Sequence, residues 1–168
     1  LDSLFYACYQ DSRFMVVGTP SGITLAPEGG AHQSVGTPLV GIGLDRLAYF
    51  EPAFVDELAS IMAWGFRHMQ ADDGGSVYLR LSTRQIAQPA REMTDTLHDQ
   101  ICRGGYWLCP PAPGAELAVV YTGAIAPEAM EAHEALLDDV PGAGLLAITS
   151  PDRLHEDWMR ARREREQG

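Results

Sequence analysis

The sequence predicts an α/β fold: two successive three-layer units in which parallel strands alternate with helices. Two observations support this prediction. Four short, largely apolar runs are typical of strands covered on both faces, as in parallel sheets, and they lie at 14–17, 77–81, 117–121 and 145–149. Segments with the apolar spacing of helices alternate with these runs, at 52–70, 127–137 and 152–166.

The first unit is predicted to span residues 1–88. Its opening stretch, 1–10, is apolar at positions 1, 4, 5 and 8 and is expected to be the end of a helix. The strand at 14–17 then leads into a long loop at 18–38. The segment after the loop is interrupted by two glycines, and we expect it to include one short strand.

The clearest helix is predicted at 52–70. Pro52 fits the first helical position, where the missing N–H group costs no hydrogen bond. One side of this helix is apolar and is expected to face the core; it consists of Phe54, Leu58, Ile61, Met62, Phe66 and Met69. The opposite, solvent-facing side is predicted to consist of Asp56, Glu57, Ser60 and Arg67.

A stretch rich in proline and glycine predicts a linker at 89–114, with a helix at 93–102 inside it. The second unit, 115–168, supplies two predicted parallel strands and two helices, the first of which begins at Pro127. Two parallel strands do not make a stable sheet unaided, so we expect further strands beyond this unit. The chain begins with Leu1 rather than methionine, and we expect it to be a piece of a longer protein.

The loop at 18–38 is the main candidate for function. It holds five glycines and three prolines in 21 residues, and irregular loops of that length in compact domains are usually functional or disordered. Its apolar content and the elements close on both sides argue against disorder. Glu28, His32 and Gln33 lie at its centre beside two glycines. An acid and an imidazole four residues apart, on backbone with little side-chain bulk, suit contact with a small ligand.

Charge and cysteine content exclude several classes of function. A formal net charge of −11 and a pI of about 4.7 oppose nucleic-acid binding, which needs clustered Lys and Arg. No run approaches the roughly 18 apolar residues that cross a membrane, and no signal peptide is visible. Three cysteines without a CxxC pair favour neither a disulfide framework nor a zinc site, so a reducing cytoplasm fits best.

Three further patterns in the sequence do not indicate a functional site. Gly123 is a single glycine, far from a dinucleotide fingerprint, and is predicted to form a tight turn. Ser21 and Ser34 lie near His32, but no Gly-x-Ser-x-Gly elbow is present and a hydrolase is not favoured. The other histidines are predicted to be solvated and lack metal-ligand spacing; they are His68, His98, His133 and His155.

Two stretches carry a family resemblance: PEGGAHQ at 27–33 and LSTRQ at 81–85. With a helix between them, they resemble thiamine-diphosphate-dependent enzymes of the transketolase-like superfamily. There the loop has an acidic residue, Gly, two small residues, His and Gln, and a later strand ends in Leu-Ser-Arg-Gln. FEPAF at 50–54 further resembles a motif of the homodimeric pyruvate dehydrogenase E1 component. The resemblance implies that 1–88 is the end of a pyrimidine-binding domain and 115–168 the start of a transketolase C-terminal domain.

The resemblance also implies roles for individual residues. The loop would face the thiazolium of the cofactor and the substrate. His32 would contact the substrate or covalent intermediate, as an acid/base or a hydrogen-bond donor. Glu28, Gln33 and Arg84 would bind the substrate, and the extra residue in LSTRQ leaves Thr83 as an alternative to Arg84.

One departure from transketolases bears on the substrate. Transketolases have a phosphate-binding His in a Thr-His-Asp-Ser run at the start of the loop. This chain has TPSG at 19–22, which is closer to the Gly-Thr-Ser-Gly of the E1 branch. Pro20 offers no donor to a phosphate. The departure therefore favours a small 2-oxoacid such as pyruvate over a sugar phosphate.

The implied function is part of an E1-like oxidoreductase that decarboxylates a 2-oxoacid and passes on the acyl unit. Its cofactors would be thiamine diphosphate and magnesium, bound mainly by upstream domains or a partner subunit, so the isolated piece is expected to be inactive. The implied partners are a second E1-like subunit in a homodimer and a dihydrolipoyl acyltransferase. Two alternatives stay open: a ketol-transferring enzyme of the transketolase type, and a non-catalytic dimerisation or interaction module.

The site residues have structural alternatives as well. His32 could be a surface or capping residue, and Glu28 could cap backbone N–H groups of the loop. Arg84 could form a surface ion pair, with Glu51, Asp72 or Asp73 as partner.

Overall fold

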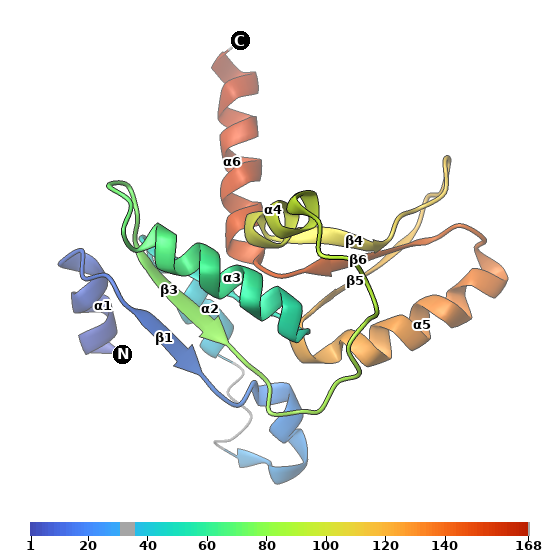
Figure 1. Cartoon of the computed structure of the whole chain (residues 1–168), viewed down its shortest axis with the longest axis horizontal. Coiled ribbons are helices and arrows are strands. Elements are labelled where there is room, and N and C mark those ends of the chain that lie inside the picture. Colours follow the sequence, from blue (N-terminus) through green and yellow to red (C-terminus); the bar gives the residue numbers. More distant parts are fainter. Residues whose placement is uncertain (31–35, 168) are drawn as a thin grey trace.

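The computed structural model describes residues 1–30 and 36–167, and its first sheet contains three parallel strands in the order β1-β3-β2 (Figure 1). These strands are β1 (Met15–Gly18), β2 (Leu47–Phe50) and β3 (Ser76–Arg80). Every residue of β3 is buried, as expected for a central strand covered on both faces. The α/β prediction with parallel-dominated sheets is confirmed.

The second sheet has the order β4-β6-β5 and contains a strand that the sequence did not predict. β5 (Ala118–Thr122) runs parallel to β6 (Gly144–Ile148), as predicted. β4 (Gly105–Cys109) lies in the predicted linker and pairs antiparallel with β6. The two predicted strands are therefore joined by a third strand from within the chain, a short edge strand that lies between glycine and proline clusters.

Helices connect and cover these strands (Figure 1). They are α1 (Asp2–Tyr9), α2 (Thr37–Ile42), α3 (Val55–His68), α4 (Asp95–Arg103), α5 (Ala126–Asp139) and α6 (Pro151–Gln167), with 3-10 turns η1 (Gly22–Glu28) and η3 (Gly123–Ile125). α2 and η1 were not predicted, and η1 gives the loop regular structure. Among the described helices, none is long and apolar enough to cross a membrane.

The predicted start of the helix at Pro52 is wrong. α3 begins at Val55, with Phe54 as its N-cap, so Pro52 precedes the helix. One oxygen of the Glu57 carboxylate accepts hydrogen bonds from the backbone N–H groups of Ala53 (2.7 Å) and Phe54 (3.0 Å). These bonds satisfy backbone donors just before the helix, which is why the helix starts at Val55, three residues after the predicted start.

The predicted polar side of this helix is also wrong in part. Glu57 and Ser60 are buried, whereas Phe66, predicted to face the core, is 53% exposed. The reason is that the segment containing α4 and β4 covers the predicted solvent side. The Tyr106 hydroxyl of β4 donates to Glu57, and His98 of α4 lies 2.7 Å from the Ser60 hydroxyl.

Both sheets share one hydrophobic core. The cluster combines Phe50, Phe54, Ile61, Val77 and Leu79 of the first unit with Ile101, Tyr106, Tyr121, Ala126, Ala129, Leu145 and Ala147 of the second. The backbone also joins the units, since the Glu51 N–H donates to the Thr149 carbonyl at 2.8 Å. The division at residues 88 and 114 therefore stays a prediction.

The prediction that His133 is solvated is wrong, because the residue is buried. Its ring Nε2 donates to the carbonyl of Ala143, 2.9 Å away, just before β6. The helical spacing that suggested an exposed side chain did not reveal that α5 packs on β6 at this point. His68 is only half-buried, while His98 and His155 are exposed.

Asp152 joins α6 to the first sheet, and its carboxylate accepts a hydrogen bond from the Tyr49 N–H at 3.2 Å. Burial raises the pKa of this carboxyl to about 6. The folded state therefore binds the proton more tightly than the unfolded chain, whose aspartate titrates near a pKa of about 3.9. As the pH rises from about 4 to about 6, ionisation of Asp152 makes folding less favourable.

We expect Asp152→Asn to remove this penalty while keeping an acceptor oxygen. The free energy of unfolding of the variant, relative to the wild type, should increase with pH across that window and level off above it. Urea unfolding between pH 4 and 7.5 measures this difference. Asp138→Asn, on the exposed side of α5, controls for the change in net charge. A difference that stays constant with pH at Asp152 would contradict the assignment.

Candidate functional site

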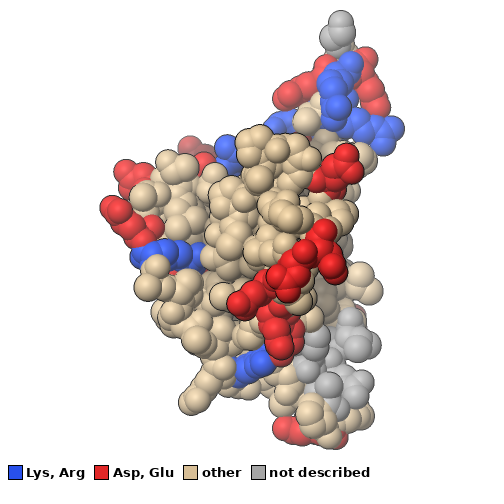
Figure 2. Space-filling view, turned by 90° about the vertical axis from the view of Figure 1, so that its right-hand side faces the viewer, with Lys and Arg blue, Asp and Glu red and all other residues tan. Residues whose placement is uncertain are grey.

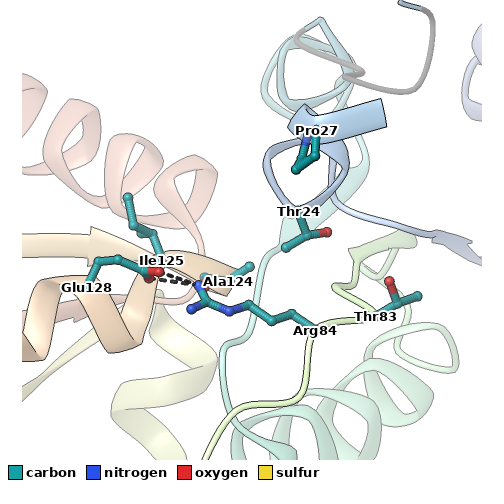
Figure 3. Close-up of a pocket in the computed structure, with 7 residues that line it drawn as sticks. All are labelled: Thr24, Pro27, Thr83, Arg84, Ala124, Ile125 and Glu128. Atoms are coloured by element: carbon teal, nitrogen blue, oxygen red, sulfur yellow. Dashed lines mark hydrogen bonds and ion pairs between the residues drawn. The ribbon is translucent and has the colours of Figure 1, made fainter. Parts of the chain in front are cut away.

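A cavity of about 600 Å³ lies where the first sheet meets the start of α5 (Figure 3). It is lined by Thr24, Pro27, Thr83, Arg84, Ala124, Ile125 and Glu128. These residues come from η1, from the segment after β3, and from η3 and α5. The segment after a parallel strand is where ligands gather in open α/β sheets.

Backbone hydrogen bonds fix the loop wall of this cavity to the sheet. The Leu81 N–H donates to the Gly18 carbonyl at 2.9 Å, which extends the pairing of β3 with β1. The Ser21 N–H donates in turn to the Leu81 carbonyl at 2.7 Å, and the Thr24 hydroxyl donates to the Ser21 carbonyl at 2.8 Å. η1 is thereby held beside the chain that leaves β3.

Arg84 crosses from the first unit to the second. Its Nη1 lies 2.6 Å and 2.8 Å from the two carboxylate oxygens of Glu128, and it donates to the Ala124 carbonyl at 3.2 Å. None of the three partners considered from the sequence is used, because the N-terminal turn of α5 lies closer. A hydrogen bond from the Arg84 N–H to the Ser82 hydroxyl, 2.9 Å, holds the segment after β3.

The predicted site residues meet the cavity to different degrees. Arg84 and Thr83 both line it, so the structure does not separate these alternatives. Glu28 is exposed at the end of η1, next to Pro27, and does not line the cavity itself. His32 and Gln33 lie outside the described residues.

Sequence reasoning missed the whole second wall of the cavity, Ala124, Ile125 and Glu128. One signal was available. The turn predicted at Gly123 follows the carboxyl end of β5, just as LSTRQ follows β3. That these two strand ends approach one another depends on how the two sheets pack.

A buried ion pair adjoins this second wall. Arg80 Nη1 lies 2.7 Å from Glu51 Oε1, and both side chains are less than a tenth exposed. The Tyr49 hydroxyl donates to the other carboxylate oxygen, and Arg80 Nε donates to the Thr37 hydroxyl at 3.1 Å. Burial and the hydrogen bond to Glu51 raise the pKa of Tyr49, which therefore stays protonated. Glu51 also lies directly against Gly123, where an added Cβ would be 2.6 Å from the Glu51 Cγ.

A second buried network joins α3 to the segment before α4. Arg91 forms two hydrogen bonds with the Asp56 carboxylate, both 2.7 Å, and one with the Tyr106 hydroxyl, 2.6 Å. Burial raises the pKa of Glu57. Burial acts in the same direction on Asp56, but the Arg91 guanidinium outweighs it and the pKa is lowered. The pKa values of these adjacent carboxyls are thus shifted in opposite directions, and their partners indicate a structural role.

The described residues fit an anionic group better than a metal complex. Among residues 1–30 and 36–167, no group of three or more His, Cys, Asp or Glu side chains could hold a metal ion. The cavity offers one guanidinium, which is paired with the Glu128 carboxylate, and two threonine hydroxyls, of which that of Thr24 donates to the Ser21 carbonyl. These groups suit a carboxylate or a single phosphoryl group, and they do not form a diphosphate–magnesium site by themselves.

Comparison with known proteins adds family information, although no family model matches the chain. The chain is 28% identical over 171 residues to the pyruvate dehydrogenase E1 component of Mycolicibacterium smegmatis, covering 98% of this chain and 18% of that protein. The chain therefore spans less than a fifth of the relative's length.

Solved transketolases share the fold. The Leishmania mexicana enzyme superposes with a TM-score of 0.75 at 16% identity, covering 93% of this chain and 22% of that one. A split-gene transketolase, solved as an inactive beta4 tetramer, gives 0.59 at 19% identity, covering 85% and 42%. The chain thus shares the fold of solved transketolases, which belong to the thiamine-diphosphate-dependent transketolase-like superfamily, and is similar in sequence to a pyruvate dehydrogenase E1 component.

Proposed function

We propose that this chain is part of a thiamine-diphosphate-dependent 2-oxoacid dehydrogenase of the E1 type and forms one wall of its substrate site. The observation that supports this most is the convergence of the two resembling stretches. Thr24 and Pro27 of the loop line the same cavity as Thr83 and Arg84 of the strand end, although nearly sixty residues separate them in sequence. The sequence similarity to E1 components favours pyruvate as the substrate.

Each wall of the cavity has a task in this proposal. The Arg84 guanidinium binds the carboxylate of the 2-oxoacid, and the Thr83 hydroxyl orients it by a hydrogen bond. His32 donates or removes a proton at the reacting carbonyl, with Glu28 and Gln33 binding the substrate, as the family resemblance of the sequence implies. Thiamine diphosphate, when bound, supplies the carbanion chemistry.

Other parts of the enzyme complete the site. We propose that thiamine diphosphate and magnesium are held mainly by domains outside this chain or by a second E1-like subunit in a homodimer. A dihydrolipoyl acyltransferase would receive the acyl unit. Residues 1–88 would end the pyrimidine-binding domain, and 115–168 would begin the C-terminal domain. The three free cysteines support a location in the reducing cytoplasm.

The test is decarboxylation of pyruvate by the full-length protein with thiamine diphosphate and Mg²⁺. We expect His32→Ala to lower kcat about a hundredfold or more, since general acid–base groups contribute on that scale. His155→Ala, on the exposed side of α6, is the matched control and should retain wild-type turnover. Unchanged turnover in His32→Ala would remove the assigned role.

A second candidate is ketol transfer of the transketolase type, which the fold of the solved relatives favours. Turnover of sugar phosphates without turnover of 2-oxoacids by the full-length protein would establish it over the E1 proposal. Absence of both activities, with intact folding and self-association, would favour the non-catalytic interaction module.

A further inference from the structure

The guanidinium proposed to bind substrate is already engaged by a carboxylate of this chain. Both oxygens of Glu128 lie within 2.8 Å of Nη1 of Arg84 (Figure 3). Glu128 is on the first turn of α5, in the second unit, and lines the same cavity. Its own backbone and the Arg84 guanidinium lower the pKa of Glu128, so the carboxylate remains charged at neutral pH.

The pair is open to displacement. The side chains of Arg84 and Glu128 are 39% and 51% exposed, and exposed ion pairs are weak. Within residues 1–30 and 36–167, Nε and Nη2 of Arg84 have no partner. A guanidinium offers five N–H donors in a planar fork. An incoming anion can therefore contact the free side of the fork before Glu128 leaves.

We propose that Glu128 competes with the substrate for Arg84 and selects a small monoanionic carboxylate, an inference that rests on the proposed function. Glu128 presents to Arg84 the same chemical group that a 2-oxoacid would present. Only the molecules in which the pair is open offer a free guanidinium. The apparent affinity for substrate is therefore reduced in proportion to the fraction of open molecules.

The selectivity follows from charge. After displacement, Glu128 remains on the wall of the cavity as a negative charge, and a dianion is repelled about twice as strongly as a monoanion. The rest of α5 adds to this field. Figure 2 shows acidic side chains gathered in a band on the face where α5 lies, and α5 contains no Lys or Arg. Its exposed acids beyond Glu128 are Glu131, Glu134, Asp138 and Asp139.

The test uses Glu128→Gln in the full-length protein, with Glu131→Gln as the matched control. Glu131 lies on the same helix, is exposed, does not line the cavity, and changes the net charge equally. We expect Glu128→Gln to lower KM for pyruvate about two- to fivefold, the range set by an exposed ion pair. Inhibition by inorganic phosphate should strengthen by a larger factor. Glu131→Gln should leave KM at the wild-type value and change phosphate inhibition by a smaller factor than Glu128→Gln does.

An Arg84→Met background shows whether the effect passes through the guanidinium. In that background, Glu128→Gln should no longer lower KM. A KM that is unchanged or raised by Glu128→Gln with Arg84 present, or lowered equally by Glu131→Gln, would overturn the competition.

Direct binding separates this inference from the proposed function. If no variant turns over pyruvate, the E1 proposal fails, and competition is judged by calorimetric titration with pyruvate and with inorganic phosphate. Tighter binding of both by Glu128→Gln than by the wild type and Glu131→Gln, with the larger gain for phosphate, would support competition. Equal affinities would overturn it.

Discussion

Arg80→Met is expected to lower the free energy of unfolding by about 3 to 5 kcal/mol. The substitution keeps a long apolar side chain but leaves the buried Glu51 carboxylate without its cation. The Tyr49 hydroxyl alone does not balance a charge with so little access to water. Urea unfolding followed by far-UV circular dichroism at pH 7.5 measures the loss.

The control for this prediction is Arg103→Met. Arg103 pairs with Asp99 at 3.8 Å and with Asp157 at 3.7 Å, but its own side chain is 61% exposed, so we expect a change within about 1 kcal/mol. A second test combines Arg80→Met with Glu51→Gln, which removes the unpaired charge. The double variant should be more stable than Arg80→Met alone. If the two losses simply add, the buried pair is not the source of the effect.

Gly123→Ala is expected to destabilise the protein by about 2 to 4 kcal/mol. Two costs combine at this position. Its φ of +58° is in the left-handed region, which costs a side-chain-bearing residue about 1 to 2 kcal/mol. A Cβ would also lie 2.6 Å from Cγ and 2.9 Å from Oε1 of Glu51, so the buried carboxylate would have to move away from Arg80.

Gly114→Ala separates these two costs. Gly114 also has a positive φ, +84°, but a Cβ there would meet nothing within 4 Å. We expect it to cost about 1 kcal/mol, from the backbone alone. The difference between the two variants, measured by urea unfolding, estimates the contact with Glu51. Equal losses would mean that Glu51 adapts without cost.

Much of the fold followed from local pattern. Largely apolar runs predicted β1, β3, β5 and β6, because a strand buried on both faces needs no polar alternation. Proline at the second position of α5 and glycine at Gly123 marked a helix start and a tight turn correctly. Edge strand β4 was not predicted because its apolar run is short and lies between segments that predict turns.

Only the wall of the cavity formed by the loop and by the segment after β3 could be predicted from the sequence. LSTRQ follows a buried strand, and the position of Thr83 and Arg84 at a strand end could be inferred from sequence alone. The loop that supplies Thr24 and Pro27 was also identified in advance. The partner of Arg84 was not predictable, because Glu128 lies 44 residues further along the chain and no local pattern links them.

The sequence by itself determined most of the strands and helices, and it singled out two distant stretches that both contribute to one cavity. Only the tertiary structure determined which polar groups are buried. Glu57 has the spacing of an exposed helical residue, yet Tyr106, 49 residues away, covers it. His133 and the pair of Arg80 with Glu51 are also buried by elements that are distant in the sequence. Helical period and strand run describe one element at a time, whereas the burial of a charge depends on which second element packs against it.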